Sequence, residues 1–264
     1  MINLLKTDIY KLFKGKAIYV CSVLSAVLTA IYLFTEYFRN IERLNSVPEE
    51  FKMYVNNGLS AVMFIPYTFI SSVMILLIIV VTIVVVFDFS NGTIKNYASK
   101  GFKREKIYLS KFIVSLIVFF ILIAITFLTC VVTASCLWGF GDIPQDFTKN
   151  LFRMIGLEML AYTAILSVFI MISMLIRKLG ISLAVNLSMI FLLPIVMVLL
   201  SVLVEKVFKL GFKIGQYWVL DYPDMLAHYN LDQTVVTRSI IVSLVTILVT
   251  SFIGIYTFKK RDIN

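Results

Sequence analysis

The chain alternates between long apolar runs and short polar segments. Six runs are about long enough to cross a membrane: 17–35, 62–87, 112–138, 156–176, 181–204 and 239–258. About 20 helical residues, rising 1.5 Å each, cross the roughly 30 Å hydrocarbon layer of a bilayer. The pattern therefore predicts an all-α integral membrane protein with six transmembrane helices, built as a single transmembrane domain over residues 1–264.

A different pattern precedes the first run. Along residues 1–16 the apolar positions fall on one side of a helix and the cations on the other: Ile2, Leu5, Ile9, Leu12 and Phe13 against Lys11 and Lys14. Such a pattern is typical of an amphipathic helix in the membrane interface, with its cations near anionic head groups. We expect an elbow helix here, separated from the first span at Gly15.

Composition agrees with a membrane protein. Hydrophobic residues make up 60% of the chain and charged residues only 15%, whereas soluble domains carry about 25% charged residues. The net charge of +9 does not indicate nucleic acid, because the cations gather in short segments at the ends of the apolar runs. Lysine and arginine are in excess on the side of both termini, so the positive-inside rule places the N- and C-termini in the cytoplasm.

Motifs for independent chemistry are absent from the sequence. It holds one histidine and lacks HExxH, GxSxG and the Walker A pattern. We therefore expect no enzyme, no bound cofactor and no metal in this chain. The three cysteines lie in apolar runs, which predicts buried, inert thiols. Glu158 and Glu205 lie near span ends, and we expect both at the membrane interface.

The polar segment 88–106, between the second and third runs, is more organised than a topology signal requires. Asn91-Gly92-Thr93 is a turn and helix-start signal, and Lys100-Gly101 is a stop signal. Between them Ile94 and Tyr97 fall on one face, while Lys95 faces away. Positive charge alone would fix topology, so this pattern predicts a one- to two-turn amphipathic helix that can sit in a partner's cleft. The outer segment 205–238 is rich in aromatic residues and predicts short amphipathic helices.

The order of residues in this segment resembles a known family. It reads D-x-x-x-G-T-x-K from Asp88, then G-x-x-R from Gly101, then Lys111 before an apolar run. This is similar to the first intracellular loop of the membrane (permease) subunits of type 2 ABC exporters, many of which carry Glu where this chain has Asp88. The elbow, the six spans and the small loops are similar to bacterial permeases that export, or confer immunity to, antimicrobial, lantibiotic or cytolytic peptides.

The resemblance implies a mechanism and partners. Two six-span subunits, the second being the same chain or a paralogue, would pair in a bacterial inner membrane. Each would dock on a cytoplasmic ABC ATPase that binds ATP and Mg²⁺. The segment would be the ATPase-coupling helix, with Asp88 and Arg104 bracing its ends; periodicity adds Ile94 and Tyr97 as apolar anchors. The full predicted set is Asp88, Gly92, Thr93, Ile94, Lys95, Tyr97, Lys100 and Arg104.

The substrate class stays open. Spans lined by apolar and hydroxyl groups suit a hydrophobic or amphipathic molecule exported from the cell or membrane, foremost an antimicrobial or cytolytic peptide. A lipid-linked antibiotic or other lipidic substrate fits nearly as well. A non-transport membrane scaffold or sensor also remains open. A secondary transporter would need coupling-ion ligands and usually an internal repeat, and the sequence shows neither.

Overall fold

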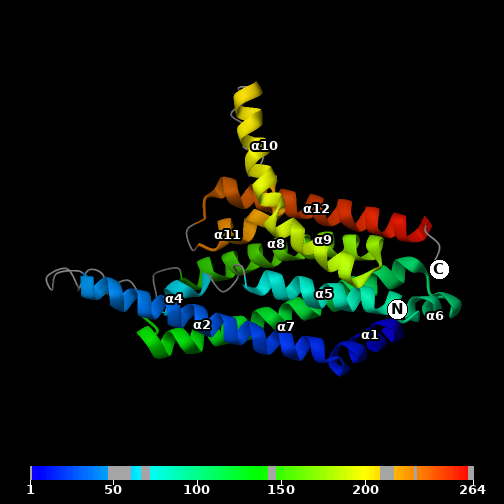
Figure 1. Ribbon diagram of the computed structural model, residues 1–264, viewed down its shortest axis with the longest axis horizontal. Coiled ribbons are helices and arrows are strands. Elements are labelled where there is room, and N and C mark those ends of the chain that lie inside the picture. The colour runs from blue at the N-terminus through cyan, green and yellow to red at the C-terminus, as the bar shows by residue number, and fades with distance from the viewer. Residues whose placement is uncertain are drawn as a thin grey trace.

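The computed structural model describes residues 2–46, 61–66, 72–141, 147–208, 217–228 and 231–260. All regular structure in these residues is helical (Figure 1). The elements are α1 (Ile2–Lys14), α2 (Lys16–Ser46), α4 (Ala61–Phe64), α5 (Ser72–Ser90), α6 (Thr93–Ser99), α7 (Arg104–Trp138), α8 (Phe147–Ile176), α9 (Leu179–Phe191), α10 (Leu193–Phe208), η3 (Val219–Asp221), α11 (Tyr222–Leu226) and α12 (Gln233–Lys260).

The long helices form an elongated bundle. Successive helices α2, α5, α7, α8, α9 and α12 run in alternating directions along its axis (Figure 1). As a result α1, α6 and the last turns of α12 lie together at one end, which we call the α6 end. The segment before α12, with η3 and α11, lies toward the opposite end.

Helices α7 and α8 supply much of the core. On α8 the side chains of Ala161, Ile165 and Phe169 recur at a spacing of four residues, and each is fully buried. Residues four apart lie on the same face of a helix, so this stripe packs inward along the length of α8. Helix α12 packs along α8, and α2 packs along α7.

Within the described part of the chain, four helices are long and apolar enough to cross a membrane: Lys16–Arg43 of α2, α7, α8 and α12. The bent pair α9–α10 is a fifth candidate if it acts as one span. The outward faces of these helices are strongly apolar, as at Leu248 and Phe252, whose side chains are 69% and 72% exposed. Extended apolar surface of this kind marks contact with lipid or with another protein, as expected for a multi-pass membrane protein.

The predicted span 62–87 is divided in the structure. Helix α4 ends at Phe64, and α5 begins only at Ser72 and counts among the shorter apolar helices. Pro66 lies two residues after Phe64. Proline lacks an N–H donor and disfavours helical backbone in the residue before it, which explains the end of α4. Residues 67–71 lie outside the described part of the chain.

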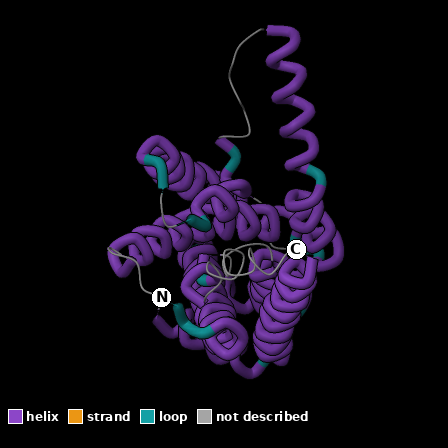
Figure 2. The backbone as a smooth tube through the Cα atoms, turned by 90° about the vertical axis from the view of Figure 1, so that its left-hand side faces the viewer, coloured by secondary structure: helices purple, strands orange, loops and turns teal. Residues whose placement is uncertain are grey.

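The predicted span 181–204 is bent by 43° between α9 and α10. The cause is Pro194, which cannot donate the hydrogen bond that would join it to the preceding turn. Helix α9 stays against the bundle, whereas α10 leaves it and projects outward (Figure 2). Its side chains are exposed on several sides, including Ile195, Val198 and Leu199.

Helix α1 is separate from α2, and the residues that it buries against the bundle form one stripe. The buried stripe is Leu4, Asp8 and Leu12, whereas Ile2 is 70% exposed and Phe13 45%. The stripe of i, i+4 and i+8 positions includes an acid, and a lysine neutralises that acid. The prediction of three buried cysteines is wrong in part: Cys21 and Cys130 are buried, but Cys136 is exposed.

Candidate functional site

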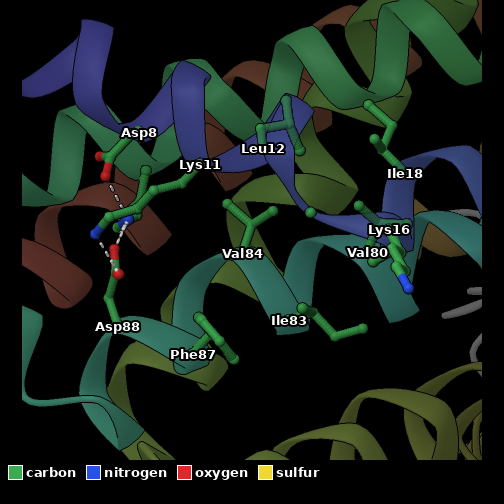
Figure 3. A pocket seen from close by; sticks show the side chains of 13 residues that line it. Asp8, Lys11, Leu12, Lys16, Ile18, Val80, Ile83, Val84, Phe87 and Asp88 are labelled. Atoms are coloured by element: carbon green, nitrogen blue, oxygen red, sulfur yellow. Dashed lines mark hydrogen bonds and ion pairs between the residues drawn. The ribbon is translucent and has the colours of Figure 1, made fainter.

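Four charged side chains meet at the α6 end, and we call them the ion cluster: Asp8, Lys11, Asp88 and Lys111. The Nζ of Lys111, on α7, donates to Asp8 Oδ1 at 2.9 Å and also to Asp88 Oδ2. The Nζ of Lys11, on α1, donates to Asp88 Oδ1 at 2.8 Å. Figure 3 shows Asp8 and Asp88 on either side of these ammonium groups. The cluster therefore ties α1, α5 and α7 together.

Burial makes the pairing in this cluster necessary. Lys111 is 2% exposed, and Asp8 and Asp88 are each 3% exposed. An unpaired charge in such a place would cost several kcal/mol, and a buried pair is tolerated only when its remaining hydrogen-bonding capacity is satisfied. Two carboxylates face two ammonium groups here, so the formal charges balance.

Two hydroxyl groups complete the shell around Asp8. Ser110 Oγ donates to Asp8 Oδ2 at 2.7 Å, and Tyr97 Oη donates to Asp8 Oδ1 at 3.2 Å. Lys11 Nζ in turn donates to Tyr97 Oη at 3.0 Å. Burial raises the pKa of Tyr97, and the negative charges of Asp8 and Asp88 raise it further. The phenol thus stays protonated at neutral pH and serves as a donor, which links α6 to the cluster.

Helix α6 lies directly over the cluster. It begins after Gly92, which has a φ of 65°, and it ends before Gly101, which has a φ of 78°. Both values lie in the left-handed region that glycine adopts at little cost. Ile94 and Tyr97, on the inner face, are 1% and 7% exposed.

These two residues belong to a small apolar cluster with Leu4 of α1, Ile107 of α7 and Phe258 of α12. We predicted Ile94 and Tyr97 as apolar anchors of a docking helix. The structure places them against the chain's own helices, so they anchor α6 to the bundle and do not form its exposed face.

The outward face of α6 is polar and basic. Lys95, Asn96, Ser99 and Lys100 are all exposed there. Gly92 and Thr93 are partly exposed at the start of the helix. The predicted site set is therefore split between a buried group (Asp88, Ile94, Tyr97) and a surface group that includes Lys95 and Lys100.

Arg104 connects this region to the end of α12. Its Nη1 donates to the backbone oxygens of Phe258, at 3.2 Å, and Lys259, at 2.7 Å. A cation near the last carbonyls of a helix is favourable, because those groups carry partial negative charge. The neighbouring Glu105 pairs with Lys259. Asp88 and Arg104 thus both act as braces, but they hold α1, α7 and α12 rather than α6 itself.

Sequence reasoning missed Asp8, Lys11 and Ser110 as members of the site. Lys11 was expected among lipid head groups, yet it is only partly exposed and pairs with Asp88. Asp8 lies four residues from both Leu4 and Leu12, so an acid on the buried stripe was the available signal. A lysine at position 111, just before a long apolar run, was the candidate partner.

A cavity of about 260 Å³ adjoins the ion cluster (Figure 3). It lies between the joint of α1 and α2 and one side of α5. The ion cluster forms one end and Lys16 the other, with apolar side chains between them. The apolar lining comprises Leu12, Ala17, Ile18, Val80, Ile83, Val84 and Phe87.

Glu158, which we expected at the membrane interface, is fully buried on α8. Neither of its carboxyl oxygens has a hydrogen-bond partner among the described residues. The cover comes from the chain itself, because η3 and α11 pack against α8. A prediction from sequence position could not include that cover.

The comparisons with known proteins give one family. Residues 66–264, well over half of the chain, match the model of DUF2705, described as a protein of unknown function. No curated protein matches the chain. The matched range includes Asp88, α6 and Lys111 and begins after α1, which carries Asp8 and Lys11.

Proposed function

We propose that the chain, which belongs to the DUF2705 family, is the membrane permease subunit of an ATP-driven ABC exporter. In this proposal the bundle crosses a bacterial inner membrane six times, with α4–α5 and α9–α10 each acting as one broken span. Helix α1 is the interfacial elbow, and both termini lie in the cytoplasm at the α6 end. The chain itself hydrolyses nothing, and ATP and Mg²⁺ bind to a separate cytoplasmic ATPase.

The main support for the proposal is that α6 has an inner face packed on the bundle and an outer face that is exposed. Its inner face is fixed to four helices: Ile94 and Tyr97 pack with residues of α1, α7 and α12, and the Tyr97 hydroxyl joins the cluster that includes Asp88 of α5. Its outer face presents Lys95 and Lys100. A partner that binds the outer face and moves would therefore move α6 and the helix ends beneath it together. A loop that served only to set the membrane topology would not need to be attached to four helices.

The exposed cations indicate the chemistry of the partner's surface. A docking cleft with acidic side chains would complement Lys95 and Lys100, and such complementarity steers association and fixes orientation. The resemblance to type 2 ABC exporters supplies the identity of that partner, a cytoplasmic ABC ATPase. It also implies a second six-span subunit, either the same chain or a paralogue.

For the substrate we propose a hydrophobic or amphipathic molecule, foremost an antimicrobial or cytolytic peptide, moved out of the cell or membrane. The described spans carry uncharged polar groups, such as Asn186 Nδ2 bonded to Thr82 Oγ1 and to Ser173 Oγ, each at 3.0 Å. A lipid-linked antibiotic fits these groups as well, and a substrate-stimulated ATPase assay separates the two.

The test is capture of the ATPase from the native membrane by full-length chain, followed by measurement of ATP hydrolysis. The variant Lys95→Glu/Lys100→Glu reverses charge on the exposed face and leaves the buried face intact. We expect it to lower capture by about tenfold or more, because like charges then face each other. The matched control is Lys149→Glu/Lys206→Glu, which reverses two exposed cations elsewhere.

Capture by wild type and by the control, with loss in the α6 variant, supports the permease assignment. If no ATPase is captured by wild type, or if both variants behave alike, the assignment is wrong. A membrane scaffold or sensor then becomes the better account of the chain.

A further inference from the structure

A second cavity, of about 550 Å³, lies at the end of the bundle opposite the α6 end. One wall is Tyr217, which precedes η3, and the other is a single face of the first turns of α12. The lining residues on α12 include Gln233, Thr234, Thr237, Arg238 and Ile241. Because α12 begins at this end (Figure 1), the cavity is a groove near the membrane surface if the bundle axis runs along the membrane normal.

The groove changes from polar to apolar along α12. Its polar lining residues on α12 lie between Gln233 and Arg238, and Ile241 follows about one turn deeper. The same side of the helix continues with Val245 and Leu248, which are exposed like Ile241. Leu248 lies ten residues after Arg238, a rise of about 15 Å, which is half of the roughly 30 Å hydrocarbon layer. The polar groups therefore lie at the depth of lipid head groups, and the apolar side chains lie at the depth of acyl chains.

Arginine supplies the charge of the groove. Among the described residues that line it, Arg238 carries the only charge. Its guanidinium carbon lies 5.2 Å from the centroid of the Tyr217 ring. A second guanidinium is held at the rim, because Arg153 Nη2 of α8 donates to Gln233 Oε1 at 2.8 Å. Arginine presents a planar set of donors that matches the oxygens of a phosphate group, so these groups favour an anionic ligand.

The acid closest to the groove along the chain is turned to another use. Asp232 directly precedes α12, and both of its carboxylate oxygens accept hydrogen bonds from Thr234. The Thr234 backbone N–H donates to Oδ1 at 3.3 Å, and its hydroxyl donates to Oδ2 at 2.9 Å. The carboxylate of Asp232 is thus held beside the start of the helix and does not line the groove. A ligand in the groove meets a guanidinium and hydroxyl groups first, and an apolar surface below them.

We propose that this groove binds one anionic phospholipid, with its phosphate on Arg238 and an acyl chain along Ile241, Val245 and Leu248. The head group then lies at the membrane surface and the chain points toward the middle of the bilayer, as in the surrounding leaflet. The bound lipid fills the space between Tyr217 and α12, and it thereby stabilises the packing of the segment before η3 against α12. This site depends neither on an ATPase nor on transport.

Native mass spectrometry of the delipidated full-length chain tests the proposal. Phosphatidylglycerol, phosphatidylcholine and inorganic phosphate are added separately, and thermal unfolding is recorded with each. Two variants disturb the site: Arg238→Gln removes the phosphate partner, and Thr237→Trp fills the groove.

Each variant has a matched control outside the groove. Lys260→Gln removes a cation that also lies over a tyrosine ring, that of Tyr256 at 4.5 Å, but at the other end of α12. Thr35→Trp replaces an exposed threonine of α2. Like Thr237, Thr35 donates its hydroxyl only to the carbonyl four residues before it, in so far as the described residues show.

We expect one tightly bound phosphatidylglycerol that raises the unfolding temperature of wild type and both controls. Arg238→Gln should reduce the preference for phosphatidylglycerol over phosphatidylcholine by about fivefold, and Thr237→Trp should abolish the tightly bound lipid. Equal binding of both lipids to wild type overturns the proposal. So does an equal loss in Lys260→Gln, undiminished binding in Thr237→Trp, or equal stabilisation by inorganic phosphate alone.

Discussion

At the scale of single residues, Lys111 is the centre of the ion cluster. Among the described residues it is the only cation within hydrogen-bond distance of Asp8, and it shares Asp88 with Lys11. Lys111→Met should therefore leave Asp8 buried with no counter-charge. We expect a loss of about 3–5 kcal/mol in the free energy of unfolding, measured by circular dichroism of the detergent-solubilised chain.

Two further variants make that result specific. Asp8→Asn/Lys111→Met removes the stranded charge and keeps the Asp88–Lys11 pair, so it should recover part of the loss. Lys11→Met should cost less than Lys111→Met, because the Lys11 side chain is 36% exposed and water can reach Asp88 once Lys11 is gone. Equally small losses from the two lysine variants would show that water reaches the whole cluster, whereas equally large losses would show that water does not reach Asp88.

Single residues also show how much of the candidate site could be predicted from the sequence. Gly92 and Gly101 were identifiable because a helix start and stop leave local signals, and the structure gives both a positive φ. The inward direction of Ile94 and Tyr97 was not identifiable. Periodicity places two residues on one face of α6, but it cannot say whether that face meets a partner or the chain's own α1, α7 and α12. That choice depends on contacts between segments far apart in the sequence.

At the scale of elements, the crossing of α7 and α12 is unusually close at Gly254. A Cβ atom built there would lie 2.7 Å from the ring of Tyr108, a fully buried side chain on α7. Gly254→Ala should therefore force Tyr108 to move within a packed core and cost about 1–3 kcal/mol of stability. The measurement is the unfolding midpoint of the purified chain.

The control for this variant lies in α8. A Cβ at Gly156 would meet nothing within 4 Å, and alanine is the better helix former by up to about 1 kcal/mol. Gly156→Ala should therefore be neutral or slightly stabilising. If Gly254→Ala is as neutral or stabilising as Gly156→Ala, the contact with Tyr108 does not restrict position 254 and the prediction is wrong.

The hydrophobic pattern predicts some helices well and others poorly. Long uninterrupted runs, as in α7 and α8, were located correctly, although both helices begin before their apolar run does. The runs that contain Pro66 and Pro194 were each predicted as a single span, and in each the helix is interrupted near its proline. Proline was visible in the sequence, but whether it bends a helix or ends it depends on how neighbouring helices pack.

At the scale of the whole molecule, the alternating directions of the helices make a prediction about sidedness. The turn at Lys178 and the end of α12 at Lys260 lie toward the α6 end, whereas α12 begins at Gln233 toward the opposite end. If the bundle axis runs along the membrane normal, positions at opposite ends of α12 must face opposite sides of the membrane. The pair α9–α10 must then bring the chain across once between Lys178 and Gln233.

Single cysteines at these exposed positions test this arrangement in a Cys136→Ser background, because Cys136 is exposed and would react. A membrane-impermeant maleimide should label Gln233→Cys in intact cells. It should label Lys178→Cys, Ser99→Cys and Lys260→Cys only after lysis, since the excess of cations near them places that end inside. Labelling of Lys178→Cys and Gln233→Cys from the same side would mean that α9–α10 re-enters without crossing. The termini would then lie on opposite sides, and a cytoplasmic ATPase could not reach both α6 and the end of α12.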